Sequence, residues 1–156
     1  MSEPEVIPFE PAYTASLCSM LSSYYNDDCR FRLTEERIVG ICQDLLDDGK
    51  RSGLCLYLLT QAGIPDGFCT LIPYAASSPD DALSGWILLR DFFIQPEKRR
   101  KSLGTFLFHA VAGQYQKDGV RGIYLTASPP ALPFWQSLGF LPYRTDSEYV
   151  LSRTEG

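Results

Sequence analysis

The segment that most constrains the fold is residues 92–105, FFIQPEKRRKSLGT, where an apolar strand pattern runs into a basic turn and then into a helix. Such a turn leaves backbone N–H groups pointing outward at the helix N-terminus, where the peptide dipoles favour negative charge. Three successive cations, Arg99, Arg100 and Lys101, add donors for a polyphosphate ligand. Taken alone, the pattern fits a solvated charge run at least as well.

The same segment resembles motif A of the GNAT superfamily of acetyl-CoA-dependent N-acetyltransferases, whose pyrophosphate loop reads Arg/Gln-x-x-Gly-x-Gly/Ala. The matching frame here is RRKSLG, residues 99–104, and Pro96 and Glu97 precede it as in the family. Ser102 replaces the first glycine. Because serine enters positive-φ conformations less readily than glycine, we expect the loop to differ slightly there or to hold Ser102 in a helix-start geometry.

A second resemblance lies at residues 131–140, ALPFWQSLGF, which are similar to the family's motif B, Ala-x-x-Phe-Tyr-x-x-x-Gly-Phe. In that motif a short helix ends at the glycine, a position that glycine favours. Trp135 stands where the motif has a tyrosine thought to protonate the departing thiolate, and an indole N–H is far too weak an acid for that task. The resemblance covers residues 6–151, although the first half matches only in pattern.

The fold class that this resemblance implies is α/β (α+β): the GNAT fold, a central mixed, mostly antiparallel twisted sheet of roughly six to seven strands flanked by about four helices. Hydrophobic periodicity predicts a compatible order of elements. The expected elements are a strand at 6–9, helices at 17–25 and 35–46, the second ending before Gly49, a hairpin of 54–60 and 68–73 turning at 63–67, a strand at 86–94, a helix from 103, a strand at 122–126, the motif B helix, and strands near 141 and 149–151.

Composition sets further bounds. With 156 residues, 45% of them hydrophobic, the chain is expected to form one GNAT-like domain over residues 1–156. The net charge of −5 disfavours nucleic acid as a partner. The N-terminus has no apolar run that would suit a signal peptide or a membrane span, so we expect a cytoplasmic protein without a membrane partner. Five cysteines without CxxC spacing predict reduced thiols and no metal site.

The activity implied by the resemblance is transfer of an acetyl group from acetyl-CoA, the acyl-donor cosubstrate, to a primary amine of a small molecule or peptide by direct attack on the thioester. Such chemistry needs positioning of the reactants, polarisation of the carbonyl and removal of a proton. The residues expected by resemblance to bind the cofactor are Phe92, Phe93, Ile94, Arg99, Arg100, Lys101, Ser102, Leu103, Gly104, Thr105, Ser128, Phe134 and Trp135.

The sequence says less about which groups are catalytic. Asp91 precedes the segment that would bind the thioester, and a carboxylate in a partly desolvated cleft can act as a base, although isolated strand carboxylates are more often structural. Tyr143 is the candidate acid for the thiolate, with Tyr149 and Ser128 as alternatives, unless the thiolate leaves without protonation by the enzyme. The one histidine, His109, falls in mid-helix, where packing or solvent exposure is expected.

For the acceptor, the connection between the first two helices offers Tyr24, Tyr25 and Asp28, which could hold a cationic amine by charge and cation–π contact. A solvated acidic loop explains the carboxylates equally well. Two rival interpretations stay open: a catalytically silent acyl-CoA-binding regulatory module, and an unrelated nucleotide-binding domain. The oligomeric state also stays open, a homodimer included.

Overall fold

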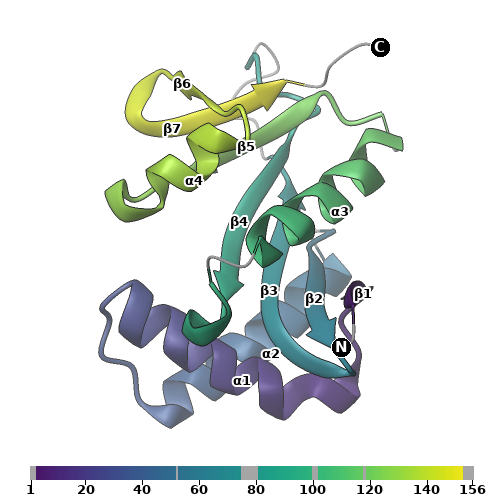
Figure 1. The fold of residues 1–156 in the computed structure, drawn as a ribbon, viewed down its shortest axis with the longest axis vertical. Helices are drawn as coiled ribbons and strands as arrows, with labels where there is room; N and C mark the ends of the chain where they lie inside the picture. The colour runs from purple at the N-terminus through teal and green to yellow at the C-terminus, as the bar shows by residue number, and fades with distance from the viewer. Residues whose placement is uncertain (1–2, 52, 75–80, 100–101, 118, 153–156) are drawn as a thin grey trace.

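The computed structural model describes residues 3–51, 53–74, 81–99, 102–117 and 119–152 (Figure 1). Its seven strands are β1 (Pro4–Pro8), β2 (Cys55–Gln61), β3 (Ile64–Pro73), β4 (Ile87–Ile94), β5 (Gly122–Thr126), β6 (Leu141–Tyr143) and β7 (Thr145–Ser152). Its α-helices are α1 (Thr14–Ser22), α2 (Glu35–Arg51), α3 (Leu103–Lys117) and α4 (Leu132–Ser137). Short helical turns are η1 (Pro11–Tyr13), the π-helix η2 (Ser23–Asp28), η3 (Pro96–Lys98) and η4 (Pro129–Ala131).

The strands form one sheet in the order β1-β2-β3-β4-β5-β7-β6. Every pairing is antiparallel except that of β4 with β5. A parallel pair needs a crossover, and α3 supplies it. The expected fold class, a mixed and mostly antiparallel sheet flanked by four helices, is therefore confirmed.

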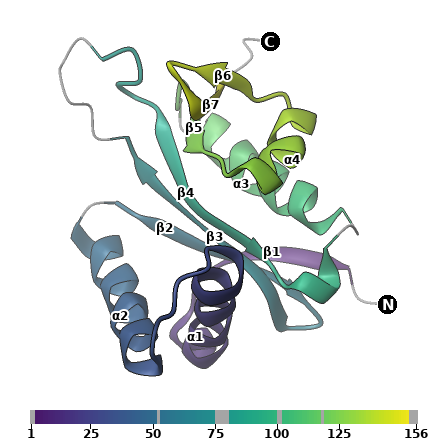
Figure 2. The ribbon, with the colours of Figure 1, turned by 90° about the vertical axis from the view of Figure 1, so that its left-hand side faces the viewer.

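Helices cover the sheet from both sides (Figure 2). Apolar residues of α1 and α2, such as Leu17 and Ile38, pack with Phe68 and Phe93 on what we call the α1 face of the sheet. On the opposite α3 face, Leu103 and Leu107 pack against β2, β3 and β4. A third cluster on the α3 face joins α4 to β5 and β7. Burial on both faces explains why β4 reads as a nearly uncharged run.

Several predicted boundaries were wrong. The strand expected at 6–9 is Pro4–Pro8, and the helix expected at 17–25 begins at Thr14 and passes into η2 after Ser22. The helix predicted to end before Gly49 continues to Arg51. The hairpin predicted to turn at 63–67 turns instead at Ala62 and Gly63, whose φ angles of 54° and 77° suit a tight two-residue turn. Pro65 therefore lies within β3, and Asp66 forms a bulge because Leu59 pairs with Gly67 while Thr60 pairs with Pro65.

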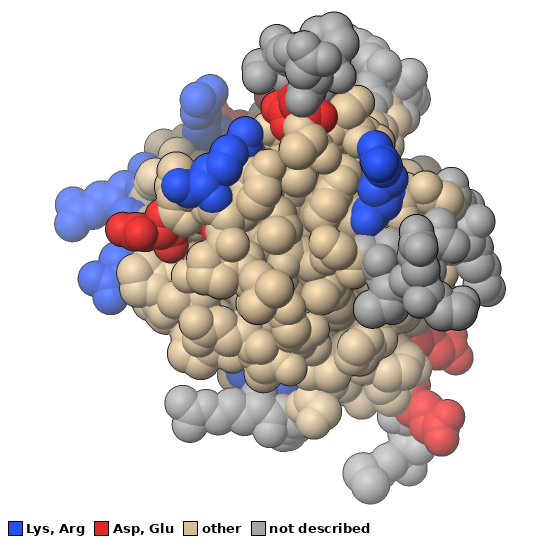
Figure 3. Space-filling view, turned by 90° about the horizontal axis from the view of Figure 1, so that it is seen from above, with Lys and Arg blue, Asp and Glu red and all other residues tan. Residues whose placement is uncertain are grey.

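The end of the molecule that carries β6 and β7 is weakly charged. Figure 3 shows it from above, with basic and acidic side chains around a broad uncharged area. The sequence agrees, since residues 122–143 contain no Asp, Glu, Lys or Arg. No helix in the described part of the chain is both long and apolar enough to cross a bilayer.

Candidate active site

The site is built where β4 and β5 diverge. The two strands pair only through Ile87 with Ile123 and Leu88 with Tyr124. β4 then continues to Ile94 while β5 ends at Thr126. Among the described residues, no strand pairs with 89–94 on the side that faces β5. The backbone of this segment, which we call the free half of β4, is therefore available to a ligand. This segment contains Phe92, Phe93 and Ile94, which the family resemblance assigns to the pantetheine arm.

A β-bulge at Arg90 determines which way the neighbouring side chains point. Leu89 pairs with Leu71 and Asp91 pairs with Thr70, which leaves Arg90 as the extra residue. Phe93 packs with α1 residues on the α1 face, whereas Ile94 packs with Leu103 of α3. The bulge thus places Asp91 on the α1 face.

Asp91 is 5% exposed and held from several sides. Thr70 Oγ1 donates to Asp91 Oδ2 at 2.6 Å and accepts the Asp91 backbone N–H at 3.1 Å. Arg90 Nε donates to the same Oδ2 at 3.2 Å. Asp91 is therefore a fixed, buried carboxyl group beside the point where the strands part.

Tyr24 and Tyr25 belong to the π-helix η2 and lie next to Asp91 of β4. Helices of this form are frequently found at functional sites. The Tyr24 ring meets Phe68 and Phe93 edge-on. Burial, and next the Asp91 charge, raise the pKa of Tyr24 far above its ordinary value and raise that of Tyr25. Both side chains thus remain neutral phenols at physiological pH.

Arg99 has protein partners rather than an open side chain. Its Nε donates to the Ile94 carbonyl at 2.8 Å, and its Nη2 contacts Asp28 Oδ2 at 2.6 Å. The guanidinium also lies over the Phe93 ring, 5.5 Å from its centroid. Arg99 and Asp28, predicted to bind cofactor and acceptor respectively, therefore join the end of β4 to η2. Arg100 and Lys101 lie outside the described residues.

Ser102 adopts φ +65°, the left-handed region that a glycine would favour. Ser102 therefore lies at the start of α3, but with a left-handed rather than a helical φ. The Phe106 N–H bonds to the Ser102 carbonyl at 3.0 Å. By helix geometry, the N–H groups of Leu103, Gly104 and Thr105 then have no acceptor inside α3. These three donors suit an anion.

A first prediction concerns the strain at this position. Ser102→Gly should stabilise the protein by about 0.5–1 kcal/mol, because glycine adopts positive φ without a Cβ clash. Urea unfolding measures the change, and Ser102→Ala, which keeps the clash but removes the hydroxyl, should show no gain. Affinity for CoA, measured by calorimetry, should not fall in either variant. A loss in both would instead assign the hydroxyl a contact with the ligand.

Helices α3 and α4 approach each other closely at Gly104. A Cβ built there would lie 3.2 Å from Cε1 and Cζ of Phe134 and 3.7 Å from Cε1 of Phe92. Trp135 is buried, with its ring against Phe92 at 5.0 Å between centroids and against Phe140 at 5.5 Å. The aromatic contacts thus tie motif B to the free half of β4. Trp135 is thus buried beneath this contact and does not form an exposed surface.

Two other predicted residues lie further from Asp91 in the fold. Ser128 is exposed at the start of η4, just beyond β5. Tyr143 is half-buried at the end of β6, with the Arg144 guanidinium over its ring at 4.8 Å. Neither contacts Asp91 among the described interactions, so their predicted roles stay predictions.

Sequence reasoning missed a polar network at the β6–β7 turn. Tyr124 donates to Glu148 Oε2 at 2.5 Å, and Arg144 Nη2 contacts the same oxygen at 2.8 Å. Tyr74 lies 3.5 Å from Arg144 Nη2 and packs edge-on against Tyr124. The hydrogen bond from Tyr124 lowers the pKa of Glu148, whereas burial and then that same bond raise the pKa of Tyr124 to about 12.

A second prediction follows from Tyr124. Its folded-state pKa is raised from an ordinary 10.0 to about 12. The neutral phenol therefore stabilises the native state fully below pH 10, and this contribution is lost as the pH rises to 12. The stability difference between the parent and Tyr124→Phe, measured by urea unfolding, should shrink across this window. A constant difference would contradict the assignment.

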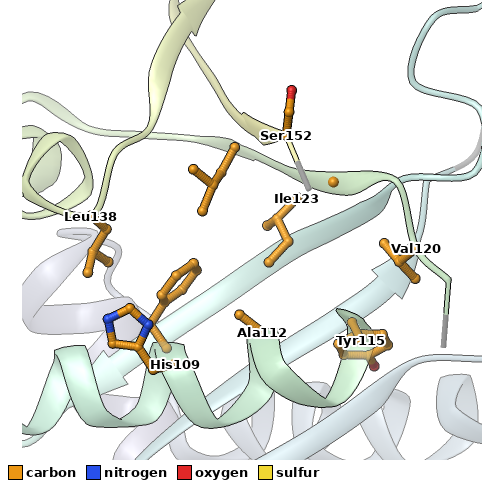
Figure 4. Close-up of a pocket in the computed structure, with 10 residues that line it drawn as sticks. His109, Ala112, Tyr115, Val120, Ile123, Leu138 and Ser152 are labelled. Carbon is orange, nitrogen blue, oxygen red and sulfur yellow. The ribbon is translucent and has the colours of Figure 1, made fainter. Parts of the chain in front are cut away.

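A separate pocket of about 230 Å³ lies on the α3 face (Figure 4). It is lined by residues of α3, β5, β7 and their neighbours: Phe108, His109, Ala112, Tyr115, Val120, Gly122, Ile123, Leu138, Leu151 and Ser152. His109 is exposed on α3 at this pocket. It thus lies on the opposite face of the sheet from Asp91.

Comparison with known proteins agrees with the geometry. The family model of the acetyltransferase (GNAT) domain matches residues 79–150, which contain β4, the basic turn, α3, β5 and motif B. No curated protein sequence matches this chain.

Solved structures extend the likeness to nearly the whole chain. An acetyltransferase from Thermus thermophilus is 21% identical, covering 98% of this chain and 100% of its own, with a TM-score of 0.75. The PaiA N-acetyltransferase of Thermoplasma acidophilum in complex with coenzyme A is 17% identical, with coverages of 98% and 99% and a TM-score of 0.74. A GNAT family acetyltransferase of Brucella melitensis in complex with acetyl-CoA is 14% identical, with coverages of 99% and 91% and a TM-score of 0.73.

Proposed function

Since the chain carries a GNAT acetyltransferase domain match within residues 79–150 and the GNAT fold throughout, we propose that it transfers an acetyl group from acetyl-CoA to a primary amine of a small molecule or peptide. The observation that carries this proposal is the divergence of β4 from β5 directly before a basic turn and a helix N-terminus. The structures with CoA and acetyl-CoA support the choice of donor.

The residues present fit the donor. The N–H groups of Leu103, Gly104 and Thr105 would hold the pyrophosphate, since they lack acceptors within α3. The backbone of 92–94 would align the pantetheine arm. Acetyl-CoA supplies an acyl group already activated as a thioester, so the protein has mainly to position the amine and polarise the carbonyl.

On the acceptor side, Asp91 would take the proton of the incoming ammonium. Its position on the α1 face beside the free half of β4 supports this role, and Thr70 would fix its orientation. Tyr143 is retained as the proposed donor to the thiolate. Its half-buried position permits the role without favouring it.

Two measurements test the proposal. Calorimetry should detect binding of CoA but not of ATP, which separates this function from a generic nucleotide-binding domain. Release of free thiol from acetyl-CoA should then depend on one or more members of a panel of primary amines. Binding of CoA without turnover would favour the silent regulatory module, a candidate that the buried Trp135 at the tyrosine position keeps open.

A further inference from the structure

We propose that the acceptor amine also carries a carboxylate and that Arg144 binds this carboxylate. The inference rests on the proposed function and specifies its acceptor class. The prediction that Tyr24, Tyr25 and Asp28 hold the cationic amine concerns the other end of the acceptor and stays a prediction.

The first observation is the way charge is layered on the α1 face. In the pair Arg90–Asp91 the side chains are 36% and 7% exposed, and in Arg144–Glu148 they are 44% and 12% exposed. In both pairs the carboxylate lies below and the guanidinium lies outside. An acceptor approaching either pair therefore meets the guanidinium before the carboxylate, although the chain as a whole has a net charge of −5.

The second observation is the location of Arg144. Ile123 and Leu125 pack on the α3 face, so Tyr124 between them points to the α1 face. Tyr124 pairs with Leu88 at the last position before β4 and β5 part. Its hydroxyl shares Glu148 Oε2 with Arg144. The guanidinium is thus anchored beside the divergence, on the same face of the sheet as Asp91.

Nothing helical shields this part of the face among the described residues. The core beneath α1 and α2 is formed with β2, β3 and β4 and includes no residue of β5, β6 or β7. The uncharged run 122–143 also leaves Arg144 without a neighbouring cation on β5 or β6. Two acids oppose its charge. The exposed Asp146 lies two residues away, and Asp81 Oδ2 lies 3.5 Å from the same Tyr74 hydroxyl that Arg144 Nη2 approaches.

The chemistry of the side chain fits a carboxylate. A guanidinium presents five donors in a planar fork, and here Nη2 faces Glu148 and Tyr74. The buried Glu148 and Tyr124 hold the group in place, so the exposed edge of the fork is preorganised for a second carboxylate. With Asp91 about three residues along β4 from Leu88, roughly 10 Å away, the amine and carboxylate should be separated by several bonds.

The test compares amines of matched length. 5-Aminovalerate, pentylamine and 1,5-diaminopentane carry a carboxylate, a methyl group and an ammonium at the far end. The value of kcat/KM should decrease in that order, with about tenfold or more between the first two. A dipeptide with a free C-terminus, compared with its amide, distinguishes a peptide carboxylate from that of a free amino acid. Equal values for 5-aminovalerate and pentylamine would overturn the inference.

Variants assign the effect to Arg144. Arg144→Gln should raise KM for 5-aminovalerate about tenfold and change pentylamine less than about twofold. Arg144→Lys should retain part of the preference, and Asp146→Asn should increase it. Arg37→Gln makes the same charge change on the exposed side of α2 and should leave the preference intact. An equal loss for both amines in Arg144→Gln, with an unchanged melting temperature, would contradict a specific carboxylate contact.

Failure of the proposed function can be distinguished from failure of this inference. If no amine supports turnover, calorimetry of 5-aminovalerate and pentylamine with the CoA-loaded protein still decides the inference. Binding of the first that is lost in Arg144→Gln supports the carboxylate site even in a silent module. Absence of binding by either amine would reject it.

Discussion

Asp91→Asn should lower kcat for acetyl transfer by about 10²–10⁴-fold and leave the affinity for CoA unchanged. The substitution keeps the shape of the side chain, and it can still accept the Thr70 hydroxyl, which now donates to Asp91 at 2.6 Å. It removes the negative charge and the ability to take a proton from the amine. Steady-state rates with one accepted amine, together with calorimetry of CoA, measure the two effects separately.

The matched control is Asp66→Asn. It makes the same change at another buried carboxyl group, which belongs to β3. This variant should retain kcat, since the Asp66 side chain has no part in the proposed mechanism. The split between the two constants gives a readout that a structural role would not move: kcat should fall in Asp91→Asn while KM for the amine stays within about threefold. Retention of kcat within about threefold, with a lowered melting temperature, would instead make Asp91 a tie between β3 and β4.

Local sequence patterns predicted the bounds of an element correctly where the residues of that element alone determine it. The strand 122–126 was predicted from its apolar run and has those bounds, and α3 begins at Leu103, where the basic turn placed it. The hairpin turn was misplaced because Pro65 and Asp66 are turn-forming residues by composition. Pairing between strands overrode that preference and made Asp66 a bulge.

The site was harder to predict from the sequence because its contacts join distant parts of the chain. Arg99 and Asp28 are 71 residues apart, and Tyr124 and Glu148 are 24 apart. No periodicity encodes such a pairing, so Arg99 read as a free cation and Glu148 was not noticed. The spacing of Arg144 and Glu148 would have indicated an ion pair on a helix, but on a strand it carries no such meaning.

Ser102 and Trp135 illustrate opposite outcomes of a departure from a family pattern. Ser102 adopts a left-handed φ of 65°, which the family's glycine would adopt more readily, at a cost in strain. Trp135 joins a buried aromatic cluster with Phe92, Phe108, Phe134 and Phe140. At these two positions the path of the chain is kept more readily than the chemistry of the side chain.

Gly104→Val should reduce CoA affinity by about tenfold or more and destabilise the protein by about 1–3 kcal/mol. The reason is the contact between α3 and α4: even a Cβ at this position would lie 3.2 Å from the Phe134 ring, and valine adds two methyl groups beyond it. The ring must move, which displaces motif B from the helix N-terminus that would hold the pyrophosphate. Calorimetry of CoA and urea unfolding measure the two changes.

The structure offers a control on the same helix and a way to locate the clash. A Cβ at Gly113 would meet nothing within 4 Å, so Gly113→Val should bind CoA as the parent does. If Phe134 is the obstacle, Phe134→Ala in the Gly104→Val background should recover stability relative to the sum of the single changes, a coupling of about 0.5–3 kcal/mol in a double-mutant cycle. Additive effects would place the clash elsewhere. Parental CoA affinity in Gly104→Val would instead show that the pyrophosphate does not lie at this end of α3.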